Sequence, residues 1–130
     1  MMILDTHVWL WWVNLEHRRL PQRCLAQIET ADKVGVSVIS CFEMAWLERH
    51  GRIVLPCDRA DWFAKALAGS GIECLPLTPA IASRAVDLPE HHRDPQDRLI
   101  IATALECGGQ LMSLDQQFPA YQELAGLLLN

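Results

Sequence analysis

The feature that most constrains the fold of this chain is an alternation of short apolar runs with longer amphipathic segments. Four runs have the length and composition of buried strands, at residues 2–4, 34–37, 72–75 and 110–114. An edge strand is also expected within 124–129. Helical patterns occupy most of the intervening chain, at residues 6–14, 21–31, 40–50, 58–68, 79–86 and 95–106. This order predicts an α/β domain whose mostly parallel sheet of four to five strands is covered by helices on both faces.

Several helix boundaries are predicted by capping residues. Pro21 is expected at the first position of the second helix, where a missing N–H group is tolerated. Ser40 is expected to begin the third helix, and Gly51 to follow its C-terminus. Thr78 and Asp94 each precede a proline, which is the pattern of an N-cap followed by a first helical residue. A polar loop is expected just before the last helix, at 89–94.

Length and composition fit one globular domain over residues 1–130, with 51% hydrophobic residues to fill its core. No apolar run approaches the roughly 18 residues needed to cross a bilayer. The apolar N-terminus lacks a basic leader and contains an aspartate, so a signal peptide is not expected. The five cysteines are scattered without C-x-x-C spacing, which argues against a zinc site or a disulfide framework. We expect small buried thiols and a reducing, cytoplasmic location.

The net charge of −5 does not by itself indicate nucleic-acid binding, because surfaces that bind phosphate are usually basic. An acidic excess concentrated in a metal site would change this reading, because bound cations reverse the local sign of the charge. Most of the basic residues are arginines, which suit bidentate phosphate contacts. The candidates for local basic patches are Arg18, Arg19, Arg23, Arg49, His50 and Arg52.

Acidic residues recur where predicted strands end and helices begin. Asp5 follows the first strand directly, and Asp115 follows the fourth. Glu43 is expected in the first turn of the helix after the second strand. Asp94 and Asp97 lie at the start of the helix that leads into the fourth strand. Open parallel sheets form their sites beyond the carboxyl ends of the strands, so we expect these acids to meet at one edge of the sheet.

Each acid also has a purely structural interpretation. Asp5 and Asp94 have the positions of helix N-caps. Ser40-x-x-Glu43 has the spacing of a capping box, and Asp115 is placed to begin a turn. Asp97 would be an ordinary acid favoured by the helix dipole. For any single residue the structural interpretation is favoured, because such caps are common. The presence of all these acids at one edge of the sheet favours a functional site there.

Clustered carboxylates repel one another unless a cation lies between them. Ligands that are all oxygen atoms suit Mg²⁺, or Mn²⁺, whereas zinc would call for histidine or cysteine. Such an ion with open coordination positions indicates phosphate chemistry, because it activates a water as a nucleophile. A second ion roughly 4 Å away would stabilise the leaving oxygen.

Five stretches of the chain resemble a known family, the PIN-domain ribonucleases, and within it the VapC-type toxins of bacterial toxin–antitoxin pairs. These stretches are residues 4–12, 37–45, 51–56, 94–102 and 113–115. Their order and spacing match over nearly the whole chain, which is more specific than a single motif. The resemblance implies a PIN-like, three-layer α/β/α fold.

The resemblance also implies that Asp5, Glu43 and Asp97 bind the metal, with Asp115 as a fourth, more variable acid. It implies hydrolysis of RNA phosphodiester bonds by a metal-activated water, leaving a 5′-phosphate and a 3′-hydroxyl. A homodimer, neutralised by a cognate antitoxin protein in the cytoplasm, is the implied assembly.

Four further residues are expected near the site. Asp94 supports the ligands, caps its helix, or does both. Thr6 orients a metal-bound water or phosphate, or caps the first helix. Arg98 pairs with a carboxylate, contacts RNA, or is solvated. Ser113 provides a hydroxyl where the family more often has threonine.

Two alternatives remain at this point. A non-catalytic PIN module would use the same fold only to bind RNA or protein. A metal-dependent phosphoryl-transfer domain would use Asp5 as the phosphate acceptor. Against the second, His7 stands where a D-x-D signature needs an acid, and no lysine occurs late in the predicted sheet.

Overall fold

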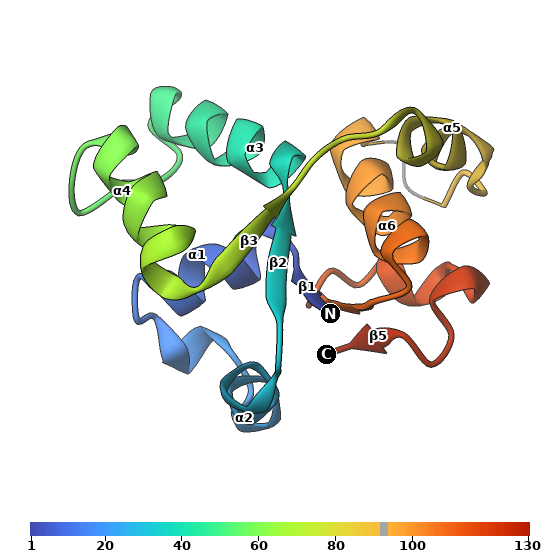
Figure 1. The fold of residues 1–130 in the computed structure, drawn as a ribbon, viewed down its shortest axis with the longest axis horizontal. Helices are drawn as coiled ribbons and strands as arrows, with labels where there is room; N and C mark the ends of the chain where they lie inside the picture. The colour runs from blue at the N-terminus through green and yellow to red at the C-terminus, as the bar shows by residue number, and fades with distance from the viewer. Residues whose placement is uncertain (92–93) are drawn as a thin grey trace.

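The computed structural model describes residues 1–91 and 94–130, and its centre is a five-stranded sheet with the order β3-β2-β1-β4-β5 (Figure 1). All four strand pairings are parallel. The strands are β1 (Met2–Leu4), β2 (Val34–Ser37), β3 (Ile72–Leu75), β4 (Gln110–Met112) and β5 (Leu128–Leu129). The predicted α/β class, the parallel sheet and the number of strands are therefore confirmed.

Helices cover both faces of the sheet. They are α1 (Thr6–Val13), α2 (Gln22–Thr30), α3 (Val38–Arg49), α4 (Arg59–Ala66), α5 (Pro79–Asp87) and α6 (Pro95–Cys107). In Figure 1 the helices α1, α2 and α4 lie on one side of the strands, and α5 and α6 lie on the other. Short 3₁₀ turns complete the chain at His17–Arg19, Ala68–Ser70, Phe118–Ala120 and Gln122–Leu124.

The central strand β1 divides the core between the two faces. Met2 and Leu4 pack into a cluster with α1, α2 and α4, while Ile3 packs into a second cluster with α6 and the C-terminal turns. Side chains alternate between the two faces of a strand. All three residues of β1 are buried, so the strand must be apolar at every position, and the run reads as continuously hydrophobic.

The third helix begins earlier than expected. The side chain of Ser37 accepts a hydrogen bond from the backbone N–H of Ile39 at 3.1 Å and caps the helix, so Val38 is its first residue. The prediction of Ser40 as the cap is wrong, because Ser40 lies inside the helix and is fully buried. Glu43 consequently lies in the second turn of α3 and not in the first.

Other boundaries differ by smaller amounts. Pro21 is the N-cap residue of α2 instead of its first helical residue. The strand β4 ends at Met112, two residues earlier than predicted. The edge strand near the C-terminus is confirmed only as Leu128–Leu129, because residues 122–124 form a 3₁₀ turn. The caps at Thr78 and Asp94 are confirmed.

The cysteines are less buried than expected. Only Cys24 is buried among the five, and Cys74 and Cys107 are exposed. The expectation of uniformly buried thiols is therefore wrong. Residues 92 and 93 of the predicted polar loop lie outside the described residues. Within the described ranges, no helix is both long and apolar enough to span a bilayer.

Candidate active site

The carboxyl ends of β1 and β4 open into a cavity of about 400 Å³. All five acids that the sequence singled out line it, together with side chains from the start of α1. The lining residues are Asp5, Thr6, His7, Val8, Trp11, Glu43, Asp94, Asp97, Leu114 and Asp115. The expected meeting of acids from four distant segments at one edge of the sheet is thus present in the structure.

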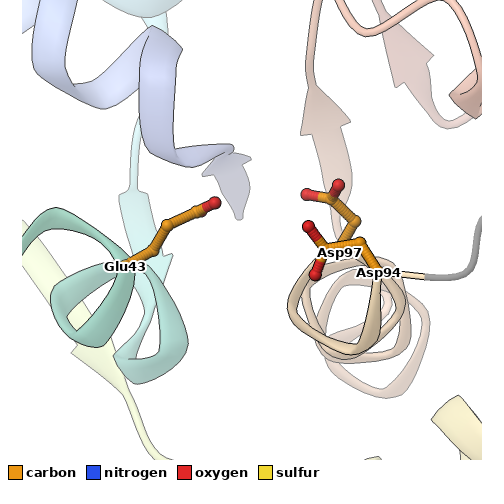
Figure 2. A group of neighbouring side chains, drawn as sticks. All are labelled: Glu43, Asp94 and Asp97. Atoms are coloured by element: carbon orange, nitrogen blue, oxygen red, sulfur yellow. The ribbon is translucent and has the colours of Figure 1, made fainter. Parts of the chain in front are cut away.

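Three of the acids form the tightest group. Oxygen atoms of Glu43, Asp94 and Asp97 all lie within 4.8 Å of one another. Figure 2 shows Glu43 extending from α3 toward Asp94 and Asp97, which project from the start of α6. Residues three apart share a helix face, so the first turn of α6 brings both aspartates to the same side. Asp94 also accepts a hydrogen bond from the backbone N–H of Gln96 at 2.9 Å, and thus caps the helix.

Asp5 is both a helix cap and part of the cavity wall. One of its carboxylate oxygens accepts the backbone N–H of Val8 at 2.9 Å, and the other accepts the hydroxyl of Ser113. Its exposed fraction is only 9%. Burial raises the pKa of the Asp5 carboxyl, although the hydrogen bonds from Ser113 and Val8 act in the opposite direction.

Glu43 is held by the first helix. The hydroxyl of Thr6 donates to Oε1 of Glu43 at 2.5 Å and lies 3.0 Å from the hydroxyl of Ser40. The capping-box interpretation of Glu43 is therefore wrong, since Ser37 caps α3. Thr6 does not cap α1 either, because Asp5 does so; instead, Thr6 ties α1 to α3 and fixes one oxygen of Glu43.

Ser113 links the ends of the two central strands. Besides donating to Asp5, its oxygen accepts the backbone N–H of Asp115 at 3.1 Å. The side chain of Asp115 accepts the backbone N–H of Gln117 at 2.8 Å, so the predicted turn at Asp115 is confirmed. Asp115 nevertheless lines the acid cavity, which means that the turn and the cavity wall use the same residue.

The neighbouring acids of the cavity change the pKa of Asp97. Burial, followed by the charges of Asp94, Glu43, Asp115 and Asp5 in that order, raises the pKa of Asp97 to about 8. Near neutral pH, Asp97 therefore holds a proton that a cation would displace. The donors that converge are carboxylate oxygens, the ligand type preferred by hard divalent ions such as Mg²⁺ and Mn²⁺. These residues fit a metal of that class.

Arg98 has an unexpected set of contacts. Its guanidinium donates to the backbone carbonyls of Ala85 and Leu88, each at 2.7 Å, and to those of Val86 and Pro89. The last carbonyls of a helix have no partner within the helix. Arg98 therefore satisfies the end of α5 and joins it to α6, a structural function that the sequence did not indicate.

The sequence interpretation also missed two cavity residues, His7 and Trp11. They line the acid cavity from α1, just beyond Asp5. Their spacing of four residues places them on the same helix face, and that spacing was the signal available in the sequence.

The fold and the site define an α/β domain with a carboxylate-lined cavity at the carboxyl ends of parallel strands. The family profile described as PIN domain matches residues 2–124. The chain therefore belongs to the PIN-domain family. Nucleases of this family generally depend on divalent metal ions, and the acid cluster fits that requirement. The phosphoryl-transfer alternative with Asp5 as acceptor is excluded by this membership.

A curated relative is similar over most of its length. The chain is 37% identical over 122 residues to a protein named Ribonuclease VapC22 from Mycobacterium tuberculosis, covering 93% of this chain and 92% of the relative. Identity at this level over nearly the full length agrees with the resemblance noted in the sequence.

Solved structures share the fold at low sequence identity. A toxin–antitoxin complex from Klebsiella pneumoniae matches with a TM-score of 0.67 and 16% identity, covering 100% of this chain and 97% of that chain. VapBC2 from Rickettsia felis, bound to a DNA fragment from its promoter, matches with a TM-score of 0.71 and 15% identity. The match covers 99% of this chain and 97% of that chain. At these identities the likeness is one of fold.

Proposed function

We propose that this chain is a Mg²⁺-dependent endoribonuclease and the toxin of a toxin–antitoxin pair. Its similarity to Ribonuclease VapC22 over nearly the full length supports the substrate class. The observation that carries the proposal is the convergence of Glu43, Asp94 and Asp97 oxygens within 4.8 Å, in a cavity also lined by Asp5 and Asp115. A non-catalytic binding module would have no need for this concentration of negative charge.

The proposed metal ligands are Asp5, Glu43, Asp97 and Asp115. Asp94 is proposed to support these ligands. It caps α6 and contributes negative charge beside Glu43 and Asp97. Mg²⁺ is the proposed ion, with Mn²⁺ as a substitute, because all of these donors are carboxylate oxygens.

The bound ion would activate a water and neutralise charge on the phosphodiester. The protein itself holds the metal-binding carboxylates in position. Thr6 fixes one oxygen of Glu43, and Ser113 fixes one oxygen of Asp5, so both carboxylates are oriented before a ligand arrives. Preorganised groups of this kind lose little conformational freedom when they bind. Cleavage is expected to leave a 5′-phosphate and a 3′-hydroxyl.

An exposed apolar stripe on α3 supports the proposed protein partners. Val38, Phe42 and Trp46 recur every four residues and are 37%, 56% and 42% exposed. Large side chains at helical spacing on a surface are typical of interfaces. The proposed assembly is a homodimer that binds an antitoxin protein.

The experiment compares the purified chain with E43Q and D97N on a panel of RNAs, with Mg²⁺ and with a chelator. We expect Mg²⁺-dependent cleavage by the natural chain and its loss in both variants, which remove a charge but keep the side-chain shape. E29Q is the matched control, because Glu29 is an exposed acid on α2 that does not line the acid cavity. Cleavage that survives in both variants would overturn the assigned site. Equal cleavage of single-stranded DNA would overturn the RNA preference.

A further inference from the structure

A second cavity continues from the acid cavity along α1. It has a volume of about 340 Å³ and is lined by His7, Leu10, Trp11, Asn14, Glu16, Arg19, Arg52, Ile53 and Val54. His7 and Trp11 line both cavities, so the two are adjacent, and the second is called here the arginine groove. The groove differs from the acid cavity in charge, because its basic residues outnumber its single acid.

Two arginines reach the groove from segments that are far apart in the sequence. Arg19 comes from the 3₁₀ turn after α1, and Arg52 from the loop after α3. The guanidinium carbon of Arg19 lies 5.9 Å from the ring centroid of Trp11, and that of Arg52 lies 5.9 Å from the ring centroid of Trp46. Both arginines are exposed, so their donors are accessible to an incoming anion.

The ion pair within the groove is weak enough to be displaced. Nε of Arg19 lies 3.3 Å from Oε1 of Glu16, and both side chains are largely exposed, at 60% and 41%. Exposed pairs of this kind contribute little, because water screens them. A phosphodiester has two non-bridging oxygens that accept the same bidentate contact, so it can replace Glu16 as the partner of Arg19.

Aromatic rings lie along the floor of the groove. His7, Trp11 and Asn14 follow one face of α1, and the rings of His7 and Trp11 are 5.8 Å apart. At the helical rise of about 1.5 Å per residue, His7 and Trp11 are offset along α1 by about 6 Å, close to the ~7 Å between the first and third of three bases stacked about 3.4 Å apart. Aromatic rings bind unpaired bases by stacking, with little dependence on sequence.

The charge of the acid cavity makes such an anchor necessary. Clustered carboxylates repel a polyanion, and a bound divalent ion would compensate for this only at the phosphate that it contacts. Neighbouring phosphates need cationic contacts outside the reach of the acids. We propose that the arginine groove binds the single-stranded RNA chain next to the cleaved bond, with Arg19 and Arg52 on phosphates and His7 and Trp11 against bases. This inference rests on the proposed ribonuclease function and specifies the form of its substrate.

The test measures binding separately from cleavage. The probe is a fluorescein-labelled, 12-nucleotide single-stranded RNA of random sequence, and fluorescence anisotropy gives its Kd over a series of salt concentrations. R19Q/R52Q is compared with R18Q/R49Q, which removes the same charge from neighbouring exposed arginines that do not line the groove. Circular dichroism checks that both variants are folded.

We expect R19Q/R52Q to bind much more weakly at low salt. Each phosphate contact changes the slope of log K against log salt by about 0.7 on single strands, so losing two reduces the slope by about 1.4. That slope corresponds to a loss of ~60-fold at ~50 mM salt, which shrinks toward parity near ~1 M. R18Q/R49Q should keep the slope of the natural chain, and a duplex of the same length should compete poorly for the groove.

Three results would overturn the proposal. If R19Q/R52Q binds RNA as the natural chain does, the groove does not bind RNA and a protein partner is its occupant instead. An equal loss in R18Q/R49Q would show that only net charge matters. Duplex RNA that competes as well as the single strand would remove the stacking argument. Failure of the proposed function looks different, because the natural chain would then bind the probe through the groove but cut no RNA with Mg²⁺.

Discussion

Replacing Asp97 by asparagine should stabilise the metal-free protein while impairing its proposed function. Asp97 is a carboxylate whose environment disfavours a charge. Its pKa rises from the usual 3.8 to about 8, chiefly through burial and then through the charges of Asp94 and Glu43. The unfolded chain ionises this group freely, whereas the folded chain holds it protonated near neutral pH. Asparagine has a similar shape and no charge, so it removes this difference.

The magnitude follows from linkage between protonation and folding. An acid with a raised pKa in the folded state lowers stability progressively as the pH rises from its unfolded pKa to its folded pKa, here from 3.8 to about 8. At about 1.4 kcal/mol for each pKa unit, the cost at pH 7 is bounded near ~4 kcal/mol. Asp97 is only partly buried, so solvent screening reduces the expected gain for D97N to about 1–2 kcal/mol.

Urea unfolding with a chelator present, at several pH values between about 5 and 9, measures the effect. The stability difference between D97N and the natural chain should grow with pH and level off above about 8. Saturating Mg²⁺ should then stabilise the natural chain more than D97N, because only the natural chain keeps the carboxylate. E29Q is the control and should follow the natural chain. A difference that is absent, or that does not change with pH, would refute the reasoning.

Three further predictions concern neighbouring contacts. Metal binding should release a proton from Asp97 below pH 8, so affinity should rise with pH, and calorimetric heats should depend on the ionisation enthalpy of the buffer. S113A should lower metal affinity and cost about 1 kcal/mol in urea unfolding, because it removes the hydroxyl that bonds to Asp5 and to the backbone of Asp115. S113T should restore both properties, and a metal affinity in S113A equal to that of the natural chain would contradict this. R98A should lower the free energy of unfolding by about 2–3 kcal/mol, because the carbonyls at the end of α5 lose their donor. R98K should restore only part of this stability, and an unchanged urea midpoint in R98A would disprove the prediction.

The sequence predicted the arrangement of elements well because their signals are local. Each strand is a short apolar run, and glycine or proline marks several helix ends, as at Gly108 and Pro79. The position of the acids followed from topology alone, since parallel strands end at one edge of the sheet. The start of α3 was less predictable. Ser37 and Ser40 are both suitable caps, and only the burial of Ser40 beside Thr6 decides between them.

The side-chain contacts of the site could not be predicted, because they depend on distances between elements. Nothing in the sequence shows that Thr6 faces Glu43, or that Ser113 faces Asp5. The same limit applies to the arginines: Arg19 and Arg52 belong to separate predicted patches, and the fold brings them to one groove. The position of Arg98 beside Asp97 in the sequence indicates a contact at the site, whereas its long side chain reaches the neighbouring helix.

The strand order also determines when this site becomes complete during synthesis. β1, at the N-terminus, lies at the centre of the sheet and pairs with β4, which is encoded more than a hundred residues later. A nascent chain on the ribosome therefore holds Asp5 and Glu43 without the partners from α6 and the end of β4. Its cavity wall stays open until α6 and the segment after β4 have been translated. A chain with this strand order cannot assemble its proposed catalytic site until α6 and β4 have been synthesised.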